Sequence, residues 1–227
     1  MRTIFVASVG DIGRKSKMND EMGLFEVMFN CRAMRRLKPD PVAEELLVKL
    51  IEAGNQAASG SNLQLARWIV VRDSKSRGEL AKLNKASVTE YIGPQSSRPA
   101  SVPHQSNTKR KRMLDAVLWQ AEHLQEVPAL IIACMLFPSA VDEKGRLQGA
   151  GSIWPGVQNV LLAARALGLG ATPTTLGLRD RKSVKEVLGM PANMEAYCLI
   201  PVGWPTGQFG PVTRLPVDQV MRFDRWS

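Results

Sequence analysis

Uninterrupted apolar runs divide the chain, and each predicts a β-strand. A run without polar alternation is typical of a strand that is buried on both faces of its sheet. The run ALIIACML at residues 129–136 follows Pro128 and predicts a central strand. Two further runs, at residues 68–71 and 196–203, predict the other strands, and Asp73 ends the first of them.

Between these runs, apolar side chains recur every three or four residues, which is the spacing of a helix. The pattern predicts helices over residues 41–57, 74–92, 113–124 and 156–170, and a short helix after Asp180. Asp40 is the expected N-cap of the first helix, with Pro41 at its first position. Gly168 is expected to end the fourth helix, and Gly189 the last.

The predicted order is helix, strand, helix, helix, strand, helix, helix, strand, with no internal repeat. This order indicates a single α/β or α+β domain over residues 23–227. Residues 93–108 are rich in Pro, Ser and Gly and predict a mobile surface loop, either a lid or a disordered segment. Residues 138–152 predict a second loop, and residues 1–22 a disordered terminus. The tail after Trp204 has little periodicity, so we expect it to lie along the protein or along a partner subunit.

The composition is that of an ordinary globular protein. A chain of 227 residues, 44% hydrophobic and 22% charged, is large enough for one good core. No apolar run reaches about 18 residues and the start lacks the regions of a secretory signal, so neither a membrane span nor secretion is expected. Cys31, Cys134 and Cys198 form no CxxC pair, which favours a reducing, cytoplasmic compartment. With only His104 and His123 and no HExxH, GxSxG or Walker sequence, no metal or nucleophile motif is present.

The net charge of +9 favours an anionic partner, which could be a nucleic acid, a membrane surface or a phosphorylated cofactor, or else it reflects a solvated basic surface. The basic run at residues 109–112 is a candidate nucleic-acid site, but aromatic residues that stack on bases are scarce around it. We interpret this run as the solvated first turn of a helix. Neither a nucleic-acid partner nor a membrane partner is therefore expected.

Residues 31–42, CRAMRRLKPDPV, concentrate positive charge just ahead of a predicted helix. Arg32, Arg35 and Arg36 lie close together in this stretch. Arginine presents a planar fork of N–H donors that binds phosphate oxygens in pairs, and a phosphate monoester carries close to two negative charges at pH 7. The candidate partners of the cluster are bulk water, a nucleic acid or one phosphate group.

Other stretches have the small side chains that suit close approach to a ligand. Ser59, Gly60, Ser61 and Asn62 predict a loop in which the glycine lets the backbone come near a bound group, although an ordinary turn has the same composition. Residues 168–173, GLGATP, superficially match a dinucleotide fingerprint. They follow a helix where the fingerprint precedes one, and the third glycine is missing, so a Rossmann site is excluded.

Five stretches, taken in order, resemble the FMN-dependent nitroreductase superfamily, which includes nitroreductases, flavin reductases, iodotyrosine deiodinase and dimethylbenzimidazole synthase. The stretches are CRAMRRLKPDPV, AASGSNLQLARWIVVRD, the helix with Gln158-Asn159 that ends in GLGATPTTLG, LGMPANMEAYCLIPVGWP, and VTRLPVDQV. They span residues 28–221, with 74–125 weakly matched. The resemblance implies an α+β fold, a three-layer α/β/α sandwich whose central sheet is mainly antiparallel and flanked by helices. It also implies a C-terminal extension that packs on a partner subunit.

The same resemblance implies which residues bind FMN. They are Arg32, Ala33, Arg35 and Arg214 at the phosphate end, Ser59, Gly60, Ser61 and Asn62 at the ring edge, and Pro173, Thr174 and Thr175 over the ring, with both threonines near flavin N5. The chain departs from the family pattern at Cys31, where another arginine is common, and at Ala33, where a serine is common. Ala58 replaces a proline, and Leu65-Ala66 replace a Pro-Trp pair.

The resemblance thus implies an FMN-dependent oxidoreductase. It would take hydride from NADH or NADPH and pass it through FMN to a nitroaromatic, a quinone or a similar small-molecule acceptor by a ping-pong mechanism. No catalytic side chain and no metal are expected, because the flavin carries the chemistry. FMN is expected at the interface of a homodimer. Two alternatives stay open: a reductive dehalogenase or flavin-fragmenting branch of the superfamily, and a basic protein that binds nucleic acid or acidic partners without redox activity.

Overall fold

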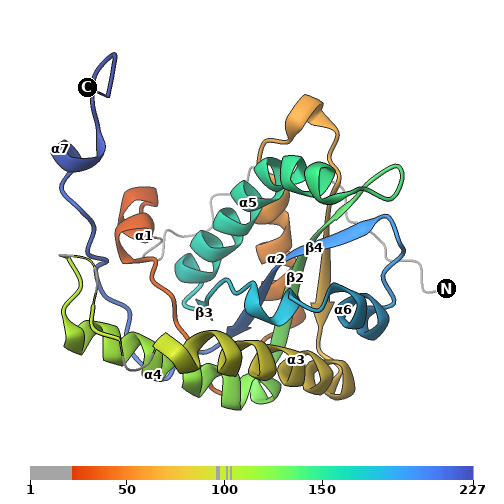
Figure 1. Cartoon of the computed structure of the whole chain (residues 1–227), viewed down its shortest axis with the longest axis horizontal. Helices are drawn as coiled ribbons and strands as arrows, with labels where there is room; N and C mark the ends of the chain where they lie inside the picture. Colours follow the sequence, from red (N-terminus) through yellow and green to blue (C-terminus); the bar gives the residue numbers. More distant parts are fainter. Residues whose placement is uncertain (1–21, 96–97, 101, 103, 227) are drawn as a thin grey trace, which may run out of the picture.

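A four-stranded sheet forms the middle layer of the protein (Figure 1). The computed structural model describes residues 22–95, 98–100, 102 and 104–226, so the expectations for residues 1–21 and for part of the 93–108 loop lie outside it. The strands are β1 (Ala66–Val71), β2 (Ala129–Leu136), β3 (Gly170–Ala171) and β4 (Met194–Gly203). Their order is β1-β2-β4-β3, and every neighbouring pair is antiparallel.

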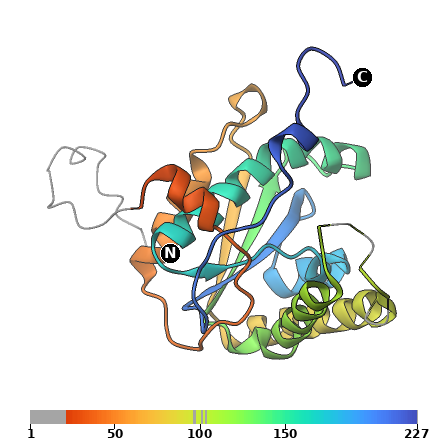
Figure 2. The ribbon, with the colours of Figure 1, turned by 90° about the vertical axis from the view of Figure 1, so that its left-hand side faces the viewer.

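Helices cover both faces of this sheet (Figures 1 and 2). One face carries α2 (Glu44–Asn55) and α5 (Glu143–Ala166), with α1 (Leu24–Asn30) beside α5. The other face carries α3 (Ser74–Ile92) and α6 (Arg181–Leu188), with α4 (Asn107–His123) packed on α3. The remaining helical pieces are η1 (Gly60–Asn62), η2 (Gly93–Gln95), η3 (Leu124–Glu126), η4 (Leu176–Leu178) and α7 (Val217–Val220).

Alternation along the strands divides the core between the two faces. In β2, Ile131 packs toward α2 and α5, whereas Ile132 packs toward α3 and α6, and both are fully buried. Burying each such side chain stabilises the fold by about 1.5–3 kcal/mol. This arrangement confirms the predicted three-layer sandwich with a central strand at residues 129–136. Strand β1 is also confirmed, but it lies at the edge of the sheet and is only partly buried.

The predicted limits of α3 and α6 are confirmed, and in each helix an aspartate caps the start. Asp73 accepts a hydrogen bond from the Ser76 backbone N–H at 2.7 Å, and Asp180 accepts one from Ser183 at 3.1 Å. The cap predicted for α2 is wrong. That helix begins at Glu44 with Ala43 as its N-cap, because the chain before it runs along the end of β4, where the Lys38 N–H donates to the Trp204 carbonyl at 2.7 Å.

The loop predicted at residues 138–152 is also wrong over most of its length, because α5 begins at Glu143. Asp142 caps it by accepting from the Gly145 N–H at 2.8 Å. Gly149, one of the glycines that indicated a loop, is instead needed for close packing of the helix. A Cβ on Gly149 would lie 2.7 Å from the Tyr197 hydroxyl, closer than side chains approach.

The C-terminal segment that carries α7 extends away from the body of the protein (Figure 1), and Figure 2 shows the same segment from the side. Large apolar side chains on it are exposed, with Phe223 at 82% and Trp226 at 69%. Such exposed apolar surface is typical of a segment that packs on another chain.

Candidate functional site

A cavity of about 230 Å³ opens beside β3, where α1, α5 and the start of the tail meet. Two backbone hydrogen bonds hold its walls together: the Met34 N–H donates to the Ala171 carbonyl at 3.1 Å, and the Val212 N–H donates to the Phe29 carbonyl at 2.9 Å. The lining residues are Met28, Cys31, Arg32, Ala33, Gln158, Leu161, Ala171, Pro173 and Arg214. Of the residues predicted to bind FMN, the structure therefore brings together Arg32, Ala33, Pro173 and Arg214.

The charge in this cavity is not neutralised by the protein. Among the described residues, no carboxylate lies within 4.0 Å of the guanidinium of Arg32 or of Arg214. Arg214 donates from Nη1 to the neighbouring Thr213 carbonyl at 2.9 Å, which leaves its other N–H donors for a ligand. Two uncompensated arginines at the mouth of a cavity attract a small anion.

The other arginines of residues 31–42 lie outside the cavity lining. Arg35 is partly buried, and this burial lowers the pKa of its guanidinium from the ordinary value. Arg36 is exposed, and its carbonyl accepts from the Thr206 N–H at 3.0 Å. The role of Arg35 in binding FMN therefore stays a prediction.

The segment from Ala171 to Thr175 leads from this cavity toward a second hollow. Thr172 is buried, and its hydroxyl has no hydrogen-bond partner among the described residues. Thr174 exchanges two backbone hydrogen bonds with Leu199 of β4, at 2.8 and 2.9 Å. Because these bonds occupy both backbone groups of Thr174, only its hydroxyl is left to donate to a ligand.

The loop of Ser59, Gly60, Ser61 and Asn62 lies apart from the cavity, and none of these residues lines it. The Gly60 N–H donates to the Ser152 hydroxyl of α5 at 3.0 Å. The cavity touches α5 further along, at Gln158 and Leu161, about 9 Å away at 1.5 Å of rise per residue.

This loop has an unusual backbone. Ser61 and Asn62 have φ of 51° and 53°, in the left-handed region that non-glycine residues seldom adopt. Strained backbone of this kind is found at ligand-binding loops. Within one chain, however, none of the loop residues joins the arginines in lining the cavity.

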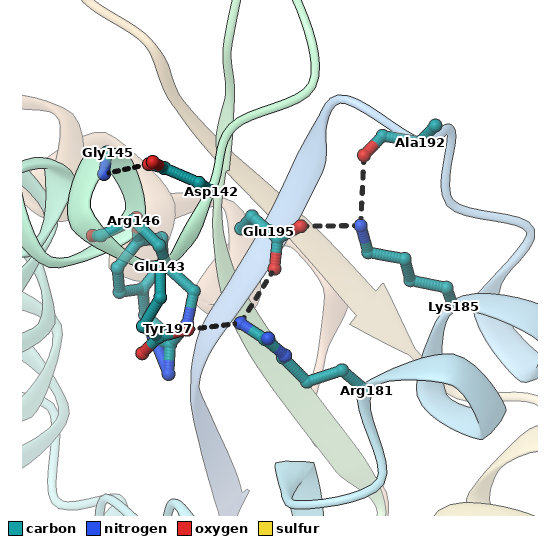
Figure 3. A network of polar contacts seen from close by, with 9 residues as sticks. All are labelled: Asp142, Glu143, Gly145, Arg146, Arg181, Lys185, Ala192, Glu195 and Tyr197. Carbon is teal, nitrogen blue, oxygen red and sulfur yellow. Dashed lines mark hydrogen bonds and ion pairs between the residues drawn. The ribbon is translucent and has the colours of Figure 1, made fainter.

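The second hollow, of about 550 Å³, lies between the first half of α5, the start of α6 and β4. Figure 3 shows the polar network at its wall, in which Arg181 lies between Glu143 and Glu195. The Arg181–Glu143 ion pair measures 2.8 Å, and Lys185 donates to the buried Glu195 at 2.5 Å. The Tyr197 hydroxyl donates to the Arg146 carbonyl at 2.7 Å, and burial raises the pKa of this tyrosine to about 12.

The arginines of the second hollow are paired, in contrast to those of the cavity. Arg146 and Arg181 pair with Glu143, and Arg179 lies 3.7 Å from Glu90. The network therefore stabilises the contact between α5, α6 and β4, and it offers less attraction to an anion. Sequence spacing could not predict it, because its members come from different elements.

Comparison with known proteins identifies the family. The model of the Nitroreductase family matches residues 30–204. The chain belongs to the Nitroreductase family. It is 25% identical to an iodotyrosine deiodinase of Thermotoga neapolitana, over 87% of this chain and 95% of that protein. It is 30% identical to an NADH dehydrogenase of Thermus thermophilus, over 84% of this chain and 90% of that protein.

A solved structure agrees with the fold of this family. Iodotyrosine deiodinase bound to FMN and 3-iodo-L-tyrosine superimposes with a TM-score of 0.70 at 23% identity, over 90% of this chain and 100% of the other. These matches confirm the resemblance and the fold that the sequence predicted. Within the described residues, no helix is long and apolar enough to cross a membrane, and no group of His, Cys, Asp and Glu is arranged to hold a metal ion.

Proposed function

We propose that this chain is an FMN-dependent oxidoreductase that passes hydride from NADH or NADPH to a small-molecule acceptor. The observation that carries the proposal is the cavity of this Nitroreductase family member, where Arg32 and Arg214 face a ligand space with no carboxylate partner. Its residues fit the phosphate end of a flavin mononucleotide. A phosphate monoester would accept charge-assisted hydrogen bonds from both guanidinium groups.

The rest of the cofactor would extend from the cavity along the segment that ends at Thr175. Gln158 offers an amide at the cavity wall, and Pro173 offers an apolar contact. When bound, FMN would supply a two-electron centre that accepts and returns hydride. The hydroxyl of Thr174 or the hydroxyl or backbone N–H of Thr175 would donate a hydrogen bond near N5 and favour the reduced form. The role of the protein is to bind, orient and shield this centre.

We further propose a homodimer in which the partner supplies the loop of Ser59 to Asn62. The loop and the arginines are two half-sites that do not line one cavity within one chain, so a complete site needs the loop of a second copy beside the arginines of the first. The exposed apolar tail around Phe223 and Trp226 supports this arrangement, because it would be covered by packing on the partner.

The reaction would follow a ping-pong order, in which oxidised nicotinamide leaves before the acceptor enters the same space. A nitroaromatic or a quinone is the proposed acceptor. The similarity to iodotyrosine deiodinase supports one alternative, reductive dehalogenation, and the threonines at 172, 174 and 175 are compatible with it. The free Cys31, Cys134 and Cys198 fit a reducing compartment such as the cytoplasm.

An absorption spectrum of the purified full-length protein tests the proposal. We expect flavin bands, release of FMN on denaturation, and bleaching under anaerobic NADH or NADPH. Reoxidation by a panel of nitroaromatics, quinones and halogenated phenols then separates the acceptor classes. A colourless protein that does not take up FMN, and that binds nucleic acid with a strong dependence on salt, would instead support the basic binding protein.

A further inference from the structure

One face of α5 continues past the cavity to an arginine that the sequence did not single out. Gln158 and Leu161 line the cavity, and Arg165 follows them at the spacing that keeps residues on one helical face. Cys31, which also lines the cavity, donates from Sγ to the Leu161 carbonyl at 3.5 Å. The thiol is thus hydrogen-bonded to α5 one helical turn before Arg165.

The guanidinium of Arg165 is held in place without being neutralised. Its Cζ lies 4.2 Å from the centre of the Phe209 ring, a cation–π contact that fixes the plane of the group. Its Nε is buried without a hydrogen-bond partner among the described residues, and no ion pair joins it to a described carboxylate. A buried, unpaired guanidinium N–H is costly, and a bound anion would remove part of that cost.

The segment that carries Phe209 also passes close to Arg32 and contains Arg214. A Cβ on Gly210 would lie 3.8 Å from Nη1 of Arg32, and four residues later Arg214 enters the cavity lining. One stretch of the tail therefore lies against Arg165, Arg32 and the cavity in succession.

The pKa of the Cys31 thiol is affected by burial and by the charges of both Arg165 and Arg214. Its burial raises the pKa, while the positive charges of Arg165 and Arg214 oppose that rise. Both arginines therefore act on a group that lies in the cavity wall.

Arg165 lies beside the cavity and does not line it in this structure. We infer that its guanidinium nevertheless reaches the phosphate group of the flavin and binds it together with Arg32 and Arg214. The inference rests on the proposed function, since it assigns a further residue to the same site. In this arrangement Phe209 is the positioning residue, which orients the guanidinium.

Flavin affinity tests the inference, because riboflavin has the ring system of FMN without its phosphate. The full-length protein is stripped of flavin, and quenching of flavin fluorescence gives Kd for FMN and for riboflavin. Arg165→Met should weaken FMN binding roughly ten- to hundredfold, as expected for a lost charge-assisted hydrogen bond. Riboflavin binding should change by less than about twofold, and Arg165→Lys should recover part of the FMN affinity.

Arg179→Met is the control, because Arg179 also stacks on an aromatic ring, Tyr91, at 5.3 Å, but it is paired with Glu90 and lines the second hollow instead of lying beside the cavity. It should leave both affinities unchanged. The inference is overturned if Arg165→Met leaves FMN affinity intact, or if FMN and riboflavin affinity fall together, which would indicate a packing role. If the unaltered protein binds no FMN, the proposed function itself fails, and the two failures are thereby distinguished.

Discussion

Gly156 of α5 lies directly against Gly54 of α2: a Cβ on Gly156 would lie 2.9 Å from the Gly54 carbonyl oxygen. The Trp68 ring closes the same contact from β1, at 3.2 Å from that Cβ position. Close approach of these two helices sets the position of α5, and α5 carries Gln158 and Leu161 of the cavity.

Gly156→Ala should destabilise the protein by about 1–3 kcal/mol, because the added methyl has no space and either the helices separate or the Trp68 ring moves. Urea unfolding followed by circular dichroism measures the change. Gly151→Ala in the same helix is the control, since nothing lies within 4 Å of its Cβ position. That change should stabilise the protein slightly, by about 0.5–1 kcal/mol, through helix propensity alone. Equal effects of the two substitutions would contradict the packing role of Gly156.

Replacing Arg32 and Arg214 together by Ala should release FMN while the fold stays intact. Both side chains are exposed and line the cavity, so the core does not depend on them. The flavin-to-protein absorbance ratio of the purified variant measures the loss, and thermal melting checks the fold. Arg112→Ala with Lys75→Ala removes the same charge from exposed positions outside the cavity and should keep its flavin. Stoichiometric flavin in the first double variant would disprove the phosphate site.

Mixing two defective variants tests whether the loop and the arginines act across a dimer. Gly60→Arg should block the flavin edge without disturbing its own chain, where only Ser152 lies near the Cβ position, at 3.5 Å. Unfolding and refolding this variant with the Arg32–Arg214 double variant gives heterodimers with one intact site of two. Bound flavin should then return to about a quarter of the normal amount, since random pairing makes half of the dimers mixed. No recovery would place both half-sites in one chain.

Glu195→Gln should destabilise the protein by about 1–3 kcal/mol, because Lys185 would lose the carboxylate that balances its charge in a mostly buried position. The unfolding midpoint in urea measures the effect. Glu186→Gln is the control, since that exposed carboxylate lies 4.0 Å from Lys182, at the limit of an ion pair. A neutral outcome at Glu195 would show that the network of Figure 3 contributes no net stability.

Asp180 gives a prediction about pH. Its hydrogen bonds from Ser183 hold the pKa of its carboxyl below the ordinary value of 3.8 in the folded state. A carboxyl whose pKa is lower in the folded state stabilises that state fully above its unfolded pKa, and loses the effect as the pH falls through the folded pKa. Asp180→Asn should therefore melt at a lower temperature than the unaltered protein at pH 7. The two melting temperatures should converge below pH 3.8. A gap that is constant with pH would contradict the role of the charge.

Much of the fold could be predicted because its signals are local. The continuous apolar run of β2 and the aspartate caps of α3 and α6 depend only on neighbouring residues, and the structure has them where the sequence indicated. The first half of α5 could not be predicted, because Gly149 reads as a loop residue in the sequence. A glycine is needed there because the Tyr197 hydroxyl, which is distant in the sequence, occupies the space that a side chain would fill.

In the candidate site, too, some residues could be predicted from the sequence and others could not. Arg32 and Arg214 were predicted from motifs and do line one cavity. Arg165, which we infer to bind the same phosphate, was not predicted, since its signal is the contact with Phe209, which only the tertiary structure shows. The distance between the Ser59 loop and the arginines could not be predicted either, because it depends on where each segment meets α5.

Helix α5 thus sets the distance between the loop of residues 59–62 and the cavity. Ser152 accepts a hydrogen bond from the loop and Gln158 lines the cavity, so the helical turns between them set the separation and the relative direction of the two. One residue inserted there would rotate one half-site about 100° around the helix axis and shift it by about 1.5 Å. In a symmetric pair of chains, both sites would lose their alignment at once. This interval of α5 should therefore keep its length.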